Sequence, residues 1–219
     1  MSPPPPKRNR VTPLGDIVAA PLRGAWCGNR GILHRGTEVT RFHASALWIT
    51  CALSFKDWRL PQFEPGHFTV LFFHDEAVSL AAGHRPCALC RRPAYTAYRR
   101  AVESAAGSVP RLAENLDAQL HTERIHRGTH RRRLHDVAWP DVPDGTFVVH
   151  DETPALVVDG TIVPWTTVGY DGPLPRPAAG RALVITPPTT LSALRGGYSP
   201  QVDPAARGQH PHSEGFPRA

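Results

Sequence analysis

The stretch FFHDEAVSLAAGHRPCALCRR, residues 72–92, carries the strongest structural signals in this chain. Asp75 is a good N-cap for a short helix because its carboxylate can accept hydrogen bonds from free backbone N–H groups, and Gly83 can end that helix. The C-x2-C pair Cys87 and Cys90 follows, and a turn between the two cysteines lets both thiols reach one point. The stretch therefore predicts a short helix that leads into a knuckle bearing two thiols.

The surroundings of the two thiols predict reactive or metal-binding sulfur. The chain after Cys90 is typical of a helix with proline in its first turn, from Pro93 to about Ala105. A helix N-terminus and nearby cations favour thiolates, so we expect lowered thiol pKa values here. The cations are Arg85, Arg91 and Arg92. A metal site suits this pair best; thioredoxin-like redox chemistry and a role as small buried hydrophobic residues are the alternatives.

The spacing of all four cysteines favours zinc. They stand at positions 27, 51, 87 and 90. A C-x2-C knuckle combined with two distant ligands can close a tetrahedral zinc site. We therefore expect zinc as the cofactor.

The same stretch resembles the metal-binding domain of Ada-type DNA methylphosphotriester repair proteins. In that family an apolar strand and a short helix precede a Gly-aromatic-Arg-Pro-Cys-x-x-Cys-Arg segment, and the resemblance covers about residues 47–92. It implies an α+β zinc-knuckle core in which Cys51, Cys87 and Cys90 bind the metal. It also implies that Cys51 is the cysteine that accepts a methyl group. The family has a further cysteine about four residues later, where this chain has Phe55.

The fourth ligand has three candidates. Cys27 and His34 both lie in the segment that precedes the expected strand, and thiolate and imidazole both suit zinc. A position left open to water is the third possibility, and a zinc-bound water becomes a nucleophile near neutral pH. The turn from Gly28 to Gly31 is either a plain β-turn or a close-approach site in which Arg30 clamps a phosphate.

Composition predicts a loop-rich α+β protein. In 219 residues, 41% are hydrophobic, which is enough to bury a core, while 24 prolines and 18 glycines predict many turns and few long helices. We find no apolar run of membrane-spanning length and no signal peptide, so we expect a cytoplasmic protein with no membrane partner. In such a reducing compartment, cysteines serve as metal ligands or reactive thiols more often than as disulfides.

The charge of the chain favours a polyanionic partner. The formal net charge is +6, and the segment HTERIHRGTHRRRLH, residues 121–135, holds four histidines and five arginines against one glutamate. Such a footprint is typical of nucleic-acid binding, and we expect DNA. A solvated loop, or a nuclease-like site that uses His126, His130 or His135, are the alternatives. The arginines expected to contact phosphates are Arg30, Arg85, Arg91, Arg92, Arg131, Arg132 and Arg133.

The chain divides by composition into four parts. We expect a disordered leader (1–10), an Ada-like zinc-binding domain (11–137), a β-rich C-terminal subdomain (138–200) and a disordered tail (201–219). In the C-terminal subdomain, Asp159-Gly160 predicts a hairpin between two short strands. The whole chain also resembles a group of bacterial proteins, a resemblance that implies no function.

Three functions fit these patterns. The first is a nucleic-acid-associated protein with a structural zinc site on a basic surface. The second is a DNA repair protein in which Cys51, bound to zinc, accepts a methyl group. The third is a metal-dependent hydrolase or nuclease with an open zinc position. The sequence leaves the oligomeric state undetermined.

Overall fold

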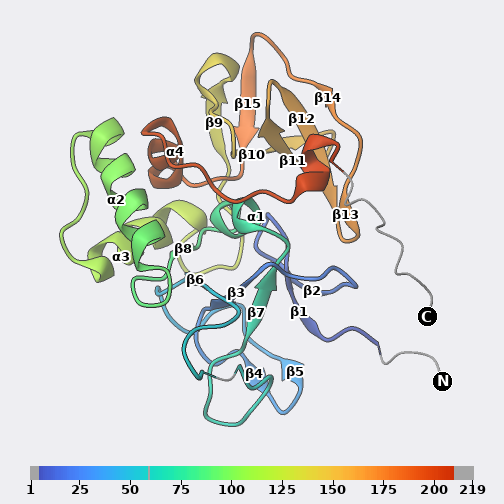
Figure 1. The fold of residues 1–219 in the computed structure, drawn as a ribbon, viewed down its shortest axis with the longest axis vertical. Helices are drawn as coiled ribbons and strands as arrows, with labels where there is room; N and C mark the ends of the chain where they lie inside the picture. The colour runs from blue at the N-terminus through green and yellow to red at the C-terminus, as the bar shows by residue number, and fades with distance from the viewer. Residues whose placement is uncertain (1–4, 59, 210–219) are drawn as a thin grey trace, which may run out of the picture.

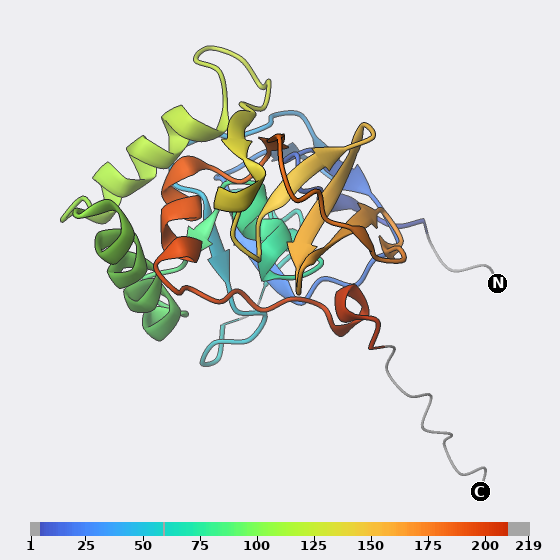
Figure 2. The same cartoon turned by 90° about the horizontal axis from the view of Figure 1, so that it is seen from above.

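A computed structural model describes residues 5–58 and 60–209, and it contains both helices and strands, which confirms the α+β class. The strands form a six-stranded sheet, a seven-stranded sheet and a separate two-stranded ribbon. In Figure 1 the N-terminal sheet lies at the bottom and the C-terminal sheet at the top, with helix α1 between them. The remaining α-helices gather on one side, and Figure 2 shows the same grouping from above.

The N-terminal sheet has the strand order β2-β1-β7-β3-β6-β8. The pairs β1–β7 and β6–β8 are parallel, and the other neighbours are antiparallel. The ribbon β4–β5 branches off after β3. The strands are β1 (Arg8–Val11), β2 (Ile17–Ala19), β3 (Trp26–Asn29), β4 (His34–Arg35), β5 (Glu38–Val39), β6 (Ile49–Cys51), β7 (Leu71–Phe73) and β8 (Arg85–Pro86).

The C-terminal sheet is antiparallel, with the order β13-β12-β11-β10-β15-β9, and β14 also pairs with β12. The predicted hairpin is confirmed: Asp159 and Gly160 join two strands, both with positive φ, as a tight turn of the primed type requires. The strands are β9 (His135–Ala138), β10 (Phe147–His150), β11 (Thr153–Val158), β12 (Thr161–Thr166), β13 (Gly169–Tyr170), β14 (Leu174–Pro175) and β15 (Arg181–Val184).

The helices begin where the sequence signals them. The Asp75 carboxylate caps α1 by accepting a 2.8 Å hydrogen bond from the Val78 backbone, and Pro93 lies in the first turn of α2. The α-helices are α1 (Glu76–Ala81), α2 (Arg92–Ala106), α3 (Ala113–Arg124) and α4 (Pro188–Arg195); two short 3-10 helices are η1 (Trp139–Asp141) and η2 (Pro204–Arg207).

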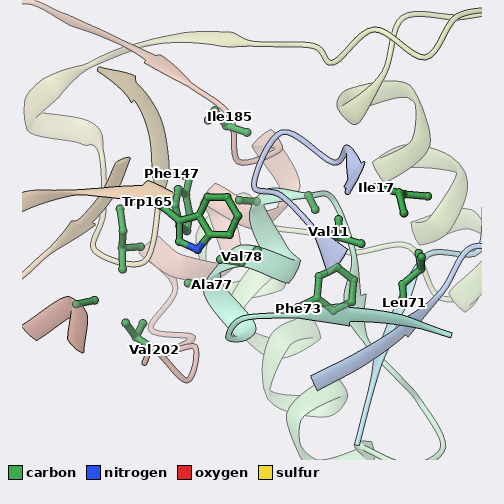
Figure 3. Close-up of a cluster of buried hydrophobic side chains, with 14 of the residues drawn as sticks. Val11, Ile17, Leu71, Phe73, Ala77, Val78, Phe147, Trp165, Ile185 and Val202 are labelled. Carbon is green, nitrogen blue, oxygen red and sulfur yellow. The ribbon is translucent and has the colours of Figure 1, made fainter. Parts of the chain in front are cut away.

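One hydrophobic core joins the two sheets, so the expected division at residue 138 does not separate two independent cores. Ala77 and Val78 of α1 pack in a single cluster with Phe73 from the N-terminal sheet and Phe147 and Trp165 from the C-terminal sheet. Figure 3 shows these side chains meeting around α1. Because burial of apolar surface contributes about 25 cal/mol per Å², this shared cluster couples the stability of the two halves.

The predicted disordered ends need correction. Strand β1 begins at Arg8, and Asn9 is fully buried, so residues 8–10 belong to the fold. At the other end, Val202 and Ala206 are buried in the core shared by the sheets, and η2 follows residue 203. Their apolar contacts are long-range, which a local reading of polar composition misses. Residues 1–4 and 210–219, which also carried the prediction of disorder, lie outside the described residues.

We predict that Gly196→Ala separates helices α2 and α4. A Cβ at residue 196 would lie 2.0 Å from the Ala101 carbonyl oxygen, and this is rigid helix backbone that cannot move aside. The expected loss is about 1–3 kcal/mol in the free energy of unfolding, measured by urea denaturation. Gly172→Ala is the matched control because nothing lies within 4 Å of its Cβ, and its stability should change by less than about 1 kcal/mol. Equal effects of the two substitutions would contradict this account of the packing.

Candidate functional site

Three thiols come together where the knuckle meets strand β6. The Sγ atoms of Cys51, Cys87 and Cys90 all lie within 4.8 Å of one another. Two backbone features bring them there: β8 runs parallel to β6, and the Cys87 N–H donates a 2.9 Å hydrogen bond to the Thr50 carbonyl. The predicted knuckle therefore docks against the end of β6, beside Cys51.

The donor set fits a thiophilic metal ion such as zinc. Two sulfurs bound to one tetrahedral zinc at 2.3 Å lie roughly 3.8 Å apart, which is within the spacing of this group. All four cysteines of the chain are free thiols, so none of these sulfurs is used up in a disulfide. The group can therefore supply three of the four ligands that a zinc ion needs.

Cys27 lies next to this group. It is directly opposite Cys51 in the antiparallel pair β3–β6, which places both side chains on one face of the sheet. Its Sγ lies 3.2 Å from the Ala52 carbonyl oxygen and 3.6 Å from that of Cys51. The Cys27 sulfur stands outside the group of three, next to its edge at Cys51.

The other candidate, His34, is placed elsewhere. Its Nδ1 lies 2.7 Å from the Thr69 hydroxyl and its Nε2 lies 3.2 Å from the Glu64 carbonyl oxygen, so both ring nitrogens have protein partners. Phe55, at the position of the missing family cysteine, packs edge-on against Trp58. Of the two candidate fourth ligands, Cys27 is therefore the one that lies beside the three-thiol group.

The pKa values of the thiols depend more on the neighbouring thiols than on the nearby arginines. The pKa of Cys87 is lowered to about 5, first by hydrogen bonding from the Cys51 thiol and then by the backbone N–H groups of Leu89 and Cys90. The pKa of Cys51 is raised because its thiol donates to Cys27 and Cys87. Burial raises the pKa of Cys90. The predicted lowering of the thiol pKa is therefore found for Cys87. Its cause is hydrogen bonding from the turn and from the adjacent thiol, not the arginines.

The arginines around the knuckle are mostly internal, which corrects their assignment to phosphate contacts. Arg85 forms a bidentate pair with Asp117, with both N–O distances 2.7 Å, and is almost fully buried. Arg91 is buried in a 2.7 Å pair with Glu76 and stacks on Trp26. A guanidinium already paired with a buried carboxylate cannot also neutralise a phosphate on the surface. Arg92 is exposed and stays a candidate.

Arg30 does not clamp a surface phosphate either, because it is completely buried. Its guanidinium lies over one face of Trp48 at 3.9 Å, and the guanidinium of Arg124 lies 4.0 Å from the same ring. Arg30 donates to the His84 Nε2 and to the Gly15 carbonyl, whereas Arg124 donates to the carbonyls of residues 83 and 46. Two cations thus enclose one buried indole by cation–π contact.

The three arginines of the run 131–133 differ in their exposure to solvent. Arg131 and Arg133 are exposed, but the Arg132 guanidinium is buried and donates to the carbonyls of Ala81, Ala82 and Ile185. Arg132 therefore links α1 to the C-terminal sheet. The prediction that it contacts phosphate was wrong. The alternation arises because Arg132 bridges to Ile125 in extended backbone, where successive side chains point to opposite sides.

The histidines of the basic segment also differ in their surroundings. His135 is tied through Nε2 to the Glu123 carbonyl at 3.0 Å. His126 is exposed, and His130 lies with its ring close to Phe42 and His43. Sequence reasoning missed Trp48 and His43 as members of this region. The signal that existed was the density of cationic and aromatic residues in two distant segments, but no spacing rule connects them.

Comparisons with family models, with curated proteins and with solved structures found no match to this chain. The resemblance to Ada-type domains therefore remains a prediction, and the site stands on its own geometry. None of the helices in the described ranges has the length and apolar character needed to cross a bilayer.

We predict that Cys27, and not His34, completes the metal site. Cys27→Ser should weaken zinc binding by at least about tenfold, measured by competition with a chromophoric chelator, because it removes one of four ligands. His34→Ala is the control and should change the affinity by less than about twofold, since that ring is held by Thr69 and Glu64. The opposite order of effects would identify the imidazole as the ligand.

Proposed function

We propose that the protein is a nucleic-acid-associated protein whose N-terminal half is held together by a structural zinc ion. The observation that carries the proposal is the three-thiol group with Cys27 beside it. Four sulfur ligands are typical of closed structural zinc sites, whereas catalytic sites keep one position for water. The nearby Cys27 therefore favours the structural role over a hydrolase with an open position.

The position of the thiols supports a structural role as well. The ligands come from three separate stretches: β3, the end of β6 and the knuckle before α2. These elements are very short, two to four residues each, and short strands contribute little stability alone. Metal–ligand bonds that exist only in the folded state would add the missing stability, because binding free energy is then also folding free energy.

The nucleic-acid partner is argued from the cations that have no carboxylate. Arg92, Arg127, Arg131 and Arg133 are exposed, and none of them forms an ion pair within the described part of the chain. Arginine binds phosphate oxygens in a bidentate manner, and phosphate neutralisation releases counterions from DNA. We expect DNA to bind along the segment that follows α3.

We predict that Arg131→Ala/Arg133→Ala weakens binding to duplex DNA of any sequence. The slope of log K against log salt should become shallower by up to about 1.8, since each lost phosphate contact contributes about 0.9. Fluorescence anisotropy at several salt concentrations measures this slope. Arg100→Ala/Arg111→Ala is the matched control, because it removes the same charge from exposed sites on α2 and before α3. An unchanged slope in the first variant would show that the segment is a solvated loop.

A second function is methyl acceptance by Cys51, which belongs to the three-thiol group. As a residue Cys51 is half-buried, whereas Cys27 and Cys87 are buried. In this reaction the Cys51 sulfur forms a bond to the methyl carbon of a phosphotriester and the carbon–oxygen bond breaks. The phosphate oxygen keeps the electron pair and leaves as a phosphodiester. Zinc, when bound, would keep the sulfur deprotonated.

We predict that DNA methylated on its phosphates adds 14 Da, the mass of about one methylene, to the peptide that contains Cys51. Peptide mass spectrometry after incubation with the zinc-loaded protein measures the addition. Cys90 is the internal control because it is also half-buried and belongs to the same thiol group. The absence of methylation at Cys51, under conditions in which an active repair domain reacts, would leave only the structural function.

A further inference from the structure

A cavity of about 660 Å³ lies where the loop that contains His43 meets the end of α3 and the segment that follows it. It is separate from the thiol group, since none of the cysteines lines it. Its volume is in the range of pockets that hold small ligands. The lining residues that matter below are His43, His121, Ile125, Arg127, His130 and Arg133.

Three imidazole rings form the aromatic part of this cavity. The ring of His43 lies 5.0 Å from that of His121 and 6.0 Å from that of His130, both nearly perpendicular to it. The His121 Nδ1 lies 2.9 Å from Arg124 Nη2. Because arginine can only donate, His121 Nδ1 is the acceptor, and its Nε2 carries the proton. That N–H has no hydrogen-bond partner among the described residues and is available to a ligand.

Positive charge lies close to two of the imidazoles that line the cavity. The rings of His43 and His121 lie 5.8 and 6.2 Å from that of Trp48, which the guanidinium groups of Arg30 and Arg124 also contact, but these two arginines and Trp48 are buried and do not line the cavity. Neither arginine forms an ion pair within the described ranges. Within the part of the chain that the structure describes, the Arg30 Nη2 and Arg124 Nε atoms are buried without a hydrogen-bond partner. Buried positive charge that has no ion-pair partner favours an anion nearby.

Two exposed arginines lie at the rim of the cavity, and two of the histidines that line it are uncharged. Arg127 and Arg133 are exposed on the rim and have no carboxylate partner in the described part of the chain. Burial, followed by the nearby positive charges, lowers the pKa of His43 and lowers that of His121 to about 4. At neutral pH these two rings are therefore uncharged, and they can donate one N–H each or stack against a flat group.

We propose that this cavity binds one nucleotide. Its phosphate is held by the Arg127 and Arg133 guanidinium groups and by the His121 Nε2–H, while its base packs against the rings of His43 and His130. Bidentate arginine suits phosphate oxygens, and aromatic side chains stack on bases regardless of sequence. The nucleotide is either free in solution or the end of a single strand; only the second source rests on the proposed nucleic-acid function.

The test is isothermal titration calorimetry of the full-length, zinc-loaded protein. The probes are adenosine 5′-monophosphate, adenosine, inorganic phosphate and a ten-nucleotide DNA strand with a 5′-phosphate. We expect the mononucleotide to bind saturably, and adenosine and phosphate each to bind at least about tenfold more weakly. His43→Ala/His130→Ala should lower the mononucleotide affinity at least about tenfold. His67→Ala/His126→Ala, which alters two exposed histidines outside the cavity, should change it by less than about twofold.

A second variant keeps the test valid if removal of His43 disturbs folding. Arg127→Glu reverses a charge at an exposed position and should also lower the mononucleotide affinity by at least about tenfold. A strand that binds at least about tenfold more tightly than the mononucleotide identifies a strand end as the source, and equal or weaker binding of the strand identifies a free nucleotide.

The failures of the two proposals are distinguishable. Zinc content and the salt slope on duplex DNA are measured on His43→Ala/His130→Ala too, and both should equal those of the unmodified protein because no arginine and no thiol is removed. The nucleotide site is overturned if the mononucleotide does not bind, if inorganic phosphate binds as tightly as the mononucleotide, or if neither His43→Ala/His130→Ala nor Arg127→Glu changes its affinity. Absence of zinc or of duplex binding in the unmodified protein would instead overturn the proposed function.

Discussion

The fold depends on one buried ion pair, between Glu76 at the start of α1 and Arg91 at the end of the knuckle. The Glu76 carboxylate also accepts hydrogen bonds from the Tyr198 hydroxyl and the Gln201 backbone N–H. One side chain thereby fixes α1, the knuckle and the C-terminal segment to each other. Loss of either partner of such a buried pair would leave an uncompensated charge, which typically costs about 3–5 kcal/mol. The ion pair thus orients the knuckle from the core outward.

This constraint explains why four thiols from three distant stretches can approach one another. The Glu76–Arg91 pair fixes the far side of the knuckle, and the backbone bond from Cys87 to Thr50 fixes the near side against β6. The pairing of β3 with β6 then brings Cys27 opposite Cys51. Packing and hydrogen bonds bring the sulfurs near one another in the folded chain, and a bound metal ion would add ligand bonds that exist only in this folded state.

The sequence predicted what depends on neighbouring residues and missed what depends on distant ones. The Asp75 cap, the proline in the first turn of α2 and the Asp159-Gly160 hairpin are confirmed because a few adjacent residues determine each of them. The short strands of the N-terminal sheet were mostly missed, because two to four residues carry no detectable period. The arginines show the limit most clearly: Arg131 and Arg132 are identical neighbours, yet Arg131 is exposed and Arg132 is half-buried, since the carbonyl partners of Arg132 come from residues 81, 82 and 185.

The burial of Arg30 and Arg124 costs desolvation free energy that the contacts within the fold do not fully offset. Arg30 and Arg124 both contact the ring of Trp48 and form no ion pair within the described ranges, and burial lowers the pKa of both well below the usual value. Carbonyl oxygens and an indole face offset part of the desolvation, but a leucine in either place would avoid that cost. Within the described part of the chain, the Arg30 Nη2 and Arg124 Nε atoms are buried without a hydrogen-bond partner, so protein groups leave part of this desolvation cost uncompensated. The same holds for Arg91 and Arg132, each of which has one buried guanidinium nitrogen without a partner, so the cost is shared by the arginines that tie the elements of this fold together.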